Sequence, residues 1–323
     1  MAIFLTEADI SDLVTIGDAI DAVEEVFKIN NQDGVINPPR QQIDIPDGYL
    51  RLTSAIVKPM KKIAVKVSSS MVFNSGSGRT LLLLDSKTGR VDAIVEVFRL
   101  GALRTAAASG VATRYLAQEN ASSLGVVGAG RQARTQIFAI RAVRPIKRII
   151  VLGRDQTKTL KFCEEMSSEL GLPVNLAKDH MDLYECSIIC TATTSHKPVL
   201  FGKNLRPGTH INSIGANRME RQELDDEVIP KCSFVTVDNK AQAQKESSLL
   251  NRAIKDVRST FCWDDVLELS DCIKSESQLH RPASAITLYN SHGVAMEDVA
   301  LATKAVDLAK ERGIGSFVEF TSF

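Results

Sequence analysis

The feature that most constrains the fold of this chain is a glycine-rich turn near its middle. The sequence reads LGVVGAGRQA from Leu124, and a second apolar run follows at 149–152 after a helix-length gap. A strand, a G-x-G-x-x-A turn opening a helix and a second strand form the β-α-β unit that holds a dinucleotide. Gly128 allows the tight turn, and Gly130 lets backbone N–H groups approach a pyrophosphate at the helix N-terminus. The pattern therefore predicts a nucleotide-binding domain.

The residues after the second strand indicate which dinucleotide is preferred. Chains that bind NAD usually carry Asp or Glu there, as an acceptor for the ribose hydroxyls. This chain has Gly153-Arg154-Asp155. Gly153 removes bulk and charge that would repel a 2′-phosphate, and the planar donors of Arg154 can bind one. We therefore expect NADP to be preferred, with NAD possible if Arg154 is a solvated surface residue and Asp155 serves the ribose.

Composition excludes several classes of partner. The 323 residues suggest two domains, and 44% hydrophobic with 24% charged residues is typical of ordinary globular cores. The 39 Lys and Arg residues balance the 39 Asp and Glu residues, so no net field favours nucleic acid or an acidic membrane. We see neither a signal peptide nor an apolar run near the roughly 18 residues that span a bilayer. The cysteines form no C-x-x-C pair, which favours reduced thiols, no metal site and a cytoplasmic location.

The order of the expected elements predicts an α/β chain with one domain inserted into another. Short strands at 174–176, 186–192, 210–215 and 234–238 continue the alternation into a Rossmann-type doubly wound parallel sheet. Residues 40–97 instead read as a mostly antiparallel sheet of about five or six strands. Helices are expected at 100–117 and 295–312, and the tail IGSFVEF can return as an extra strand. We therefore expect a dinucleotide-binding domain at 118–300, inserted into an α+β substrate-binding and dimerisation domain of 1–117 plus 301–323.

Several ordered blocks give the chain a resemblance over its whole length. They are PPR from Pro38, GYLRLTSA from Gly48, AVKV around Lys66, ALRTAAASG from Ala102, VVGAGRQA, PGTHINSIGAN from Pro207, RQELDDEV from Arg221 and NSHGVAMEDVA from Asn290. In these blocks the chain resembles the ornithine cyclodeaminase/μ-crystallin family, which also contains archaeal alanine dehydrogenases and ketimine or pyrroline-carboxylate reductases. The resemblance implies a homodimer that acts on a small amino or imino acid with a nicotinamide cofactor.

The resemblance also implies a set of site residues. Arg40, Lys66 and Arg104 match positions that contact the substrate, and Arg51 is a further candidate. The matched positions at the cofactor are Thr80, Thr105, Gly128, Gly130, Arg131, Gln132, Thr191, Asn212, Ser213, Ile214, Gly215, Arg221 and Ser291, to which Arg154 is added.

The residue types suit this chemistry. Two arginines can hold an α-carboxylate by paired hydrogen bonds and so orient the α-carbon for hydride transfer. A desolvated Lys66 beside two cations would have a lowered pKa, which lets it exchange a proton with the substrate nitrogen near neutral pH. We therefore expect Lys66 and Arg104 to be catalytic.

One position departs from the cyclodeaminase pattern. Where cyclodeaminases carry an aspartate thought to act on the substrate amine, this chain has Asn217, and an amide cannot take up a proton. Asp298 is a possible second acid, unless it only stabilises the start of a helix. We therefore expect a reductase of imino acids or an amino-acid dehydrogenase, with Asn217 and Asp298 in its catalytic set. The alternatives are an ornithine cyclodeaminase, which forms proline and recycles bound NAD, and a non-catalytic protein that binds a small ligand together with NADPH.

Overall fold

The computed structural model describes residues 1–30, 33–46, 48–71, 78–275 and 281–320. The chain forms two compact units, of which the first is Met1–Arg104 with Val294–Phe323 and the second is Thr105–Gly293. These bounds differ from the expected 117/118 and 300/301. The reason is that helix α3, Phe98–Leu116, continues through the first boundary, so no loop marks that point in the sequence.

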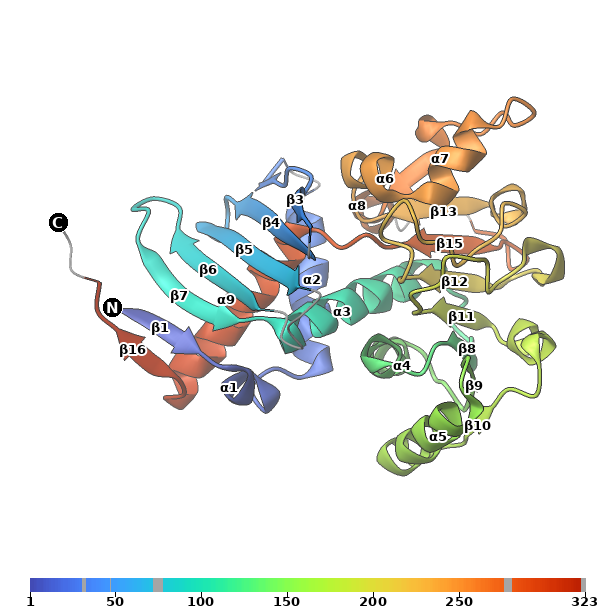
Figure 1. Ribbon diagram of the computed structural model, residues 1–323, viewed down its shortest axis with the longest axis horizontal. Coiled ribbons are helices and arrows are strands. Elements are labelled where there is room, and N and C mark those ends of the chain that lie inside the picture. The colour runs from blue at the N-terminus through green and yellow to red at the C-terminus, as the bar shows by residue number, and fades with distance from the viewer. Residues whose placement is uncertain (31–32, 47, 72–77, 276–280, 321–323) are drawn as a thin grey trace. The chain divides into compact units, whose positions relative to one another are not determined.

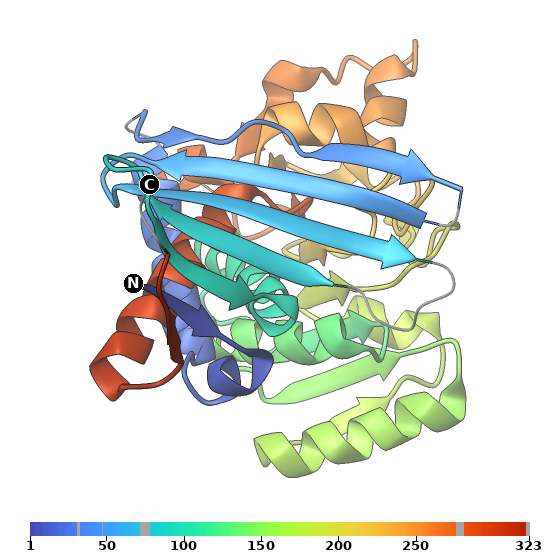
Figure 2. The same cartoon turned by 60° about the vertical axis from the view of Figure 1, so that its left-hand side comes forward.

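The first unit is an α+β unit built on one mixed sheet. Its elements are β1 (Ala2–Leu5), α1 (Glu7–Ser11), α2 (Ile16–Asn30), β2 (Val35–Ile36), β3 (Gln41–Ile45), β4 (Gly48–Val57), β5 (Lys62–Met71), β6 (Arg79–Asp85), β7 (Val91–Glu96), the start of α3, α9 (Ala295–Arg312) and β16 (Ser316–Val318). The strand order is β16-β1-β7-β6-β5-β4-β2, with β3 also paired to β4. Figure 2 shows the long antiparallel strands β4 to β7 of this sheet in blue to cyan.

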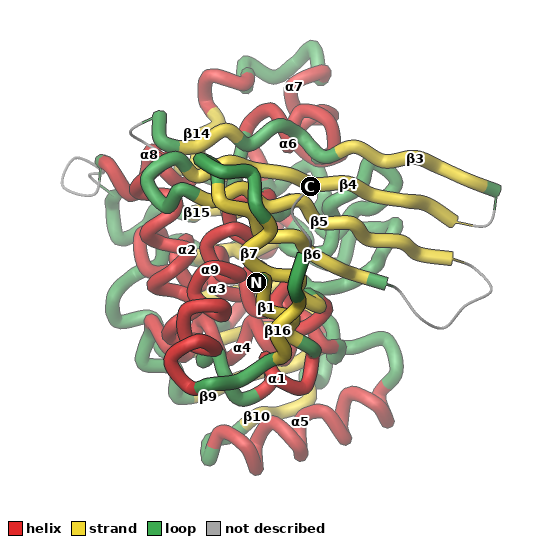
Figure 3. Tube along the Cα trace, turned by 90° about the vertical axis from the view of Figure 1, so that its left-hand side faces the viewer, coloured by secondary structure: helices red, strands yellow, loops and turns green. Residues whose placement is uncertain are grey.

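The C-terminal tail returns to the first unit, as expected. Strand β16 pairs antiparallel with β1, and β1 pairs parallel with β7 (Figure 3). The two ends of the chain therefore close one edge of the same sheet. The sequence pattern did not indicate β1, because its four residues form an uninterrupted apolar run too short to show a period.

The two faces of this sheet differ in how they are covered. Helix α9 packs on one face, beside α2 (Figure 1), and the residues of β4 that point there, Thr53, Ala55 and Val57, are buried. Strand registry places the alternate residues on the other face. That face is apolar yet only partly buried, and its residues include Leu52, Ile63, Val65, Val67, Leu82, Leu84 and Ile94. We name this set the open apolar face.

The second unit is a doubly wound α/β unit. After the rest of α3 its elements are β8 (Ser123–Val127), α4 (Arg131–Val143), β9 (Arg148–Leu152), α5 (Gln156–Leu170), β10 (Val174–Leu176), β11 (Ile188–Thr191), β12 (His210–Ser213), β13 (Phe234–Val237), α6 (Lys240–Glu246), α7 (Ser248–Lys255), β14 (Val266–Glu268), α8 (Leu269–Lys274) and β15 (Thr287–Asn290). Short 3₁₀ segments lie at His180–Glu185, Gly202–Asn204, Ile229–Lys231 and Trp263–Asp265.

All neighbouring strands of the second sheet are parallel, in the order β10-β9-β8-β11-β12-β15-β13-β14. This confirms the expected Rossmann-type sheet and the strands expected up to residue 238. Strands β14 and β15 were missed. Because β15 lies between β12 and β13, the missed strand is an interior one, and its carboxyl end lies on the edge where doubly wound folds bind ligands.

Among the described residues, the helices are too short or too polar for any of them to cross a membrane.

Candidate functional site

In the first unit, a buried cluster of charged side chains joins three elements. Lys66 on β5 donates a hydrogen bond to Asp298 Oδ2 at the start of α9. Arg104 on α3 donates from Nη1 to Glu297 Oε2 at 2.9 Å, and its Nε lies 3.4 Å from Asp298 Oδ1. The side chains of Lys66 and Asp298 are 12% and 4% exposed, so these charges interact with little screening by water. We call Lys66, Arg104, Glu297 and Asp298 the lysine cluster.

The surroundings of Lys66 lower its pKa as the sequence predicted. The pKa of Lys66 is lowered to about 8, mainly by burial, with a smaller lowering by the cations Arg104 and Arg40 and an opposing effect of Asp298. Burial alone would raise the pKa of Asp298, but Lys66, Arg104 and Arg40 together bring it below its usual value. An amine with a pKa near 8 can both donate and accept a proton close to neutral pH, which is the property required of a general acid or base.

The lysine cluster explains why α9 begins where it does. Two acidic residues, Glu297 and Asp298, lie in its first turn, where the helix dipole favours negative charge. The N-cap residue Val294 supplies no side-chain hydrogen bond, but Asn37 Oδ1 accepts from the backbone N–H of Met296 at 2.9 Å. Asp298 therefore stabilises the helix start and also contacts Lys66. Glu297, which is fully buried, was missed by the sequence reading, although its place beside Asp298 in the MED motif was a usable signal.

Two other predicted residues of the first unit lie outside this cluster. Arg51 is on the same face of the sheet as Lys66, but it donates to Gln42 Oε1 at 2.7 Å and stacks on the Tyr49 ring. Thr80 pairs with Val67 on β5 and is exposed on the opposite face from Lys66. Their roles at substrate and cofactor stay predictions.

In the second unit, the glycine-rich turn has the local geometry of a phosphate cradle. Gly128 has a φ of +115°, and a Cβ there would lie 2.6 Å from the carbonyl oxygen of Ala192. Gly130 is the N-cap of α4, and a Cβ there would meet nothing within 4 Å. Open space before the first-turn N–H groups of Arg131 and Gln132 suits an anion, because those groups have no helical acceptor. The residues present therefore fit the pyrophosphate of a dinucleotide.

The turn after β9 requires a different explanation of Gly153. A Cβ on Gly153 would lie 2.0 Å from Thr159 Oγ1, which donates to the Asp155 carbonyl at 2.6 Å. The glycine is thus needed for packing within the turn, whatever ligand binds nearby. Asp155 is the N-cap of α5 and accepts from the Lys158 N–H at 3.0 Å, while Arg154 is exposed.

Next along this edge, the turns after β11 and β12 are joined by a carboxylate that the sequence reading missed. Glu223 accepts hydrogen bonds from Thr191 Oγ1 at 2.8 Å and from the Gly215 N–H at 2.8 Å. Its neighbour Arg221 donates to the Gly215 carbonyl at 3.3 Å. Glu223 lies in the RQELDDEV block, so a buried acid beside a matched arginine was the available signal.

A second buried acid holds the turn after β15. Asp238 follows β13 and accepts from Ser291 Oγ at 3.2 Å, from the His292 N–H at 2.9 Å and from the Gly293 N–H. Ser291 was among the matched cofactor positions, and its hydroxyl is committed to this carboxylate. The carboxyl ends of β11, β12 and β15 thus each end in a turn fixed by a buried acid.

Most of the remaining predicted residues of the second unit contact other parts of the protein and stabilise the fold. Asn212 is buried and donates to Thr113 Oγ1 at 3.0 Å, which ties β12 to α3. Ile214 packs in the core formed with α4 and α5. The Thr105 carbonyl accepts from Gln136 Nε2 at 3.4 Å, and Asn217 is half-buried in the segment after β12. Their roles at the cofactor or in catalysis stay predictions.

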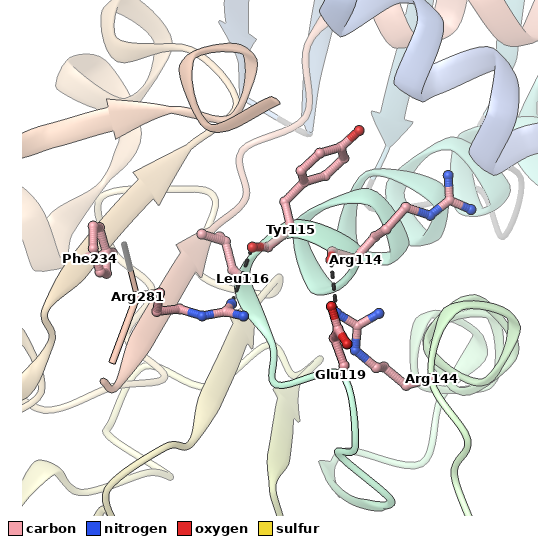
Figure 4. Close-up of a pocket in the computed structure, with 7 residues that line it drawn as sticks. All are labelled: Arg114, Tyr115, Leu116, Glu119, Arg144, Phe234 and Arg281. Atoms are coloured by element: carbon pink, nitrogen blue, oxygen red, sulfur yellow. Dashed lines mark hydrogen bonds between the residues drawn. The ribbon is translucent and has the colours of Figure 1, made fainter. Parts of the chain in front are cut away.

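A cavity of about 150 Å³ in this unit is lined by Arg114, Tyr115, Leu116, Glu119, Arg144, Phe234 and Arg281 (Figure 4). Arg144 donates to the carbonyls of Arg114, Ala117 and Gln118 at 2.8, 2.9 and 2.9 Å. It therefore satisfies the carbonyl groups that the C-terminus of α3 leaves without helical donors, which is a structural role.

Comparison with known proteins identifies the family of the chain. The model of the ornithine cyclodeaminase/mu-crystallin family matches residues 1–313. The chain belongs to this family. A Delta(1)-pyrroline-2-carboxylate reductase of Bacillus cereus is 30% identical over 318 residues, covering 96% of this chain and 97% of that protein.

Solved structures of relatives share the fold over nearly the whole chain. The Delta(1)-pyrroline-2-carboxylate reductase of Thermococcus litoralis, in complex with NADH and L-proline, has a TM-score of 0.91 at 32% identity and covers 98% of this chain and 100% of its own. An archaeal alanine dehydrogenase dimer with bound NAD also has a TM-score of 0.91, at 28% identity, covering 99% of each chain. Membership of the ornithine cyclodeaminase/mu-crystallin family thus confirms the resemblance on which the site residues were assigned.

Proposed function

We propose that this chain is an NAD(P)-dependent oxidoreductase that acts on the C–N bond of amino and imino acids. The observation that carries the proposal is Lys66, whose pKa is lowered to about 8 within a buried set of acids and arginines. The cradle at Gly128 and Gly130 supplies the second requirement, a place for a dinucleotide. Relatives named as pyrroline-2-carboxylate reductase and alanine dehydrogenase catalyse reactions at this bond, which supports the same class here.

We assign each residue of the site a role in substrate binding or in proton transfer. Arg40 and Arg104 bind the substrate carboxylate through charge-assisted hydrogen bonds and so fix the α-carbon. Lys66 donates a proton to the substrate nitrogen during reduction and accepts one during oxidation. Asp298 holds the Lys66 ammonium in place through its hydrogen bond. A bound nicotinamide would supply or accept the hydride.

We propose NADP as the preferred cofactor on the strength of Arg154 alone. Gly153 is not evidence for that preference, because its packing against Thr159 is enough to explain a glycine at this position. Asp155 already caps α5 through one carboxylate oxygen, which makes it a weaker acceptor for a ribose. The relatives above were solved with NADH and NAD, so the choice depends on whether Arg154 meets a 2′-phosphate.

We also propose that the chain forms a homodimer through the open apolar face of the first unit. An uncovered apolar sheet face is unfavourable in water and is buried when a second copy packs on it. A cytoplasmic location, which six free cysteines favour, stays a prediction from the sequence.

A substrate screen tests the proposed function. The chain is incubated with NADH or NADPH and pyrroline-2-carboxylate, piperideine-2-carboxylate, or 2-oxo acids with ammonia or methylamine, while absorbance of the reduced cofactor is followed. We expect oxidation of the cofactor with at least one imino acid. Ammonia release from ornithine without net cofactor change would identify a cyclodeaminase instead. Tight NADPH binding without turnover of any substrate would identify a non-catalytic binding protein.

A further inference from the structure

The Glu223 side chain occupies an unusual position for an acid. It is 0% exposed and lies in the segment between β12 and β13. One carboxylate oxygen, Oε1, accepts from the Thr193 N–H at 2.5 Å. The other, Oε2, accepts from the Gly215 N–H and the Thr191 hydroxyl at 2.8 Å each and from Ser213 Oγ at 3.4 Å. In each of these four hydrogen bonds the carboxylate is the acceptor.

These donors come from two turns that lie side by side at the carboxyl edge of the sheet. Thr191 ends β11 and Thr193 lies in the turn after it. Ser213 ends β12 and Gly215 lies in the turn after it, and the two strands are paired. The turns approach so closely that a Cβ on Gly215 would lie 2.0 Å from the Thr193 carbonyl oxygen. Only glycine fits at that point, so the carboxylate and the close approach of the two turns depend on each other.

The glycine-rich turn continues the same edge. The Ala192 N–H donates to the Val127 carbonyl at 2.9 Å, and a Cβ on Gly128 would lie 2.6 Å from the Ala192 carbonyl oxygen. The turn that Glu223 holds is therefore in contact with the turn that forms the phosphate cradle. In open parallel sheets a dinucleotide lies along this edge, at the carboxyl ends of the strands.

The pattern of donors favours an ionised carboxylate. Each oxygen faces one backbone N–H, whose hydrogen cannot rotate away as a hydroxyl hydrogen can. A carboxylate accepts from both N–H groups, whereas an amide nitrogen in the place of one oxygen cannot accept and would leave the N–H of Thr193 or of Gly215 without an acceptor. Burial raises the pKa of Glu223, and the donor hydrogen bonds act against that rise.

We propose that Glu223 is a positioning residue for the nicotinamide half of the cofactor. Its ionised carboxylate sets the spacing of the turns after β11 and β12, and it acts through residues 191–193 and 213–215. The inference rests on the proposed function, since it requires a nicotinamide dinucleotide to bind at this edge. Glu223 is not among the matched cofactor positions, and the effect that we propose for it is indirect.

The test compares a whole cofactor with the part that lacks nicotinamide. Glu223→Gln keeps the size of the side chain but cannot accept from both N–H groups. Its dissociation constants for NADH and for ADP-ribose are measured by titration beside those of the unaltered protein, and NADPH with 2′-phospho-ADP-ribose forms a second pair. We expect Glu223→Gln to weaken binding of NADH about tenfold, the effect of one hydrogen bond to the nicotinamide lost when the turns move, and to weaken binding of ADP-ribose less than about twofold.

Two further variants make the result specific. Glu220→Gln removes the same charge from an exposed side chain three residues away and is expected to change neither constant. Glu223→Asp keeps a carboxylate on a side chain that is one carbon shorter. It should therefore weaken binding of NADH more than binding of ADP-ribose, but by a smaller factor than Glu223→Gln. If Glu223→Gln does not fold, the same comparison is made with Glu223→Asp.

Equal weakening of NADH and ADP-ribose would show a general structural role and overturn the proposal, as would unchanged affinity for both. These outcomes differ from failure of the proposed function. A protein that binds neither NADH nor NADPH before any substitution contradicts the oxidoreductase itself.

Discussion

Lys66 and Asp298 show how a single residue pair can be both charged and poised for proton transfer. A fully exposed lysine is almost entirely protonated at pH 7 and gives up its proton only at high pH. Burial and two nearby arginines bring the pKa of Lys66 down to about 8, while Asp298 keeps the ammonium oriented. The lysine cluster thus makes both protonation states available within the physiological range.

This pKa predicts opposite pH profiles for the two directions of the reaction. Reduction of an imino acid needs the protonated lysine, so its kcat/KM should be constant below about pH 8 and fall above it. Oxidation of the amino acid needs the neutral amine, so its kcat/KM should rise up to about pH 8 and then level off. Lys66→Ala should lower kcat about 10²- to 10⁴-fold in both directions, the usual contribution of a general acid or base, and leave the Kd of NADH unchanged. Profiles that keep their shape in Lys66→Ala would contradict this role.

Arg154 is the residue on which cofactor choice depends. Arg154→Ala should raise the dissociation constant of NADPH about tenfold or more, the effect of losing a charge-assisted hydrogen bond to a phosphate. It should change the dissociation constant of NADH less than about twofold. Dissociation constants from fluorescence titration check this. Lys161→Ala, which removes another exposed cation from the neighbouring helix, serves as the matched control. An equal effect of Arg154→Ala on both cofactors would mean that this arginine does not bind the 2′-phosphate.

At the scale of elements, the turn between β9 and α5 allows a packing role of Gly153 to be distinguished from a role in cofactor binding. Gly153→Ala places a methyl group against Thr159 and should lower the free energy of unfolding by about 1–3 kcal/mol, the range for overpacking a tight site. In a Thr159→Ala background the same substitution should cost less, because the clashing hydroxyl is gone. Urea unfolding of the two single variants and the double variant measures the difference. If Gly153→Ala has unchanged stability but binds NADPH more weakly, Gly153 has a role at the cofactor.

The long helices and most strands of the second sheet were predicted well, whereas its edge strand β14 and its interior strand β15 were not. Helices α3 and α9 and the strands from β8 to β13 were expected close to their observed bounds. Strands β14 and β15 are as short as β10 to β13, and no period distinguishes a strand of that length from a loop, so a short apolar run can be assigned either way. The packing role of Gly153 was not foreseen, since the sequence does not reveal that the Thr159 side chain folds back over the turn.

For the whole molecule, the open apolar face predicts the state of assembly. Light scattering after size exclusion should give a mass about twice the 35.2 kDa of one chain. Leu82→Glu, at the centre of this face, should shift the mass toward that of one chain, because a buried unpaired carboxylate opposes association. Asp92→Asn, elsewhere on the same sheet, should leave the mass unchanged. A monomer before any substitution, at micromolar concentration, would contradict the proposed dimer.

The sequence by itself determined the class of the chain, its family and the glycine-rich turn, because apolar periods and glycine conformations are encoded by residues near one another. It also identified Lys66, Arg104 and Asp298 as candidates. Only the tertiary structure decided which of these meet, since Lys66 and Asp298 are 232 positions apart and their hydrogen bond depends on the chain returning to its first unit. The same holds for Glu223. Its place in the RQELDDEV block is visible in the sequence, but its contact with two strand ends exists only once the parallel sheet has formed.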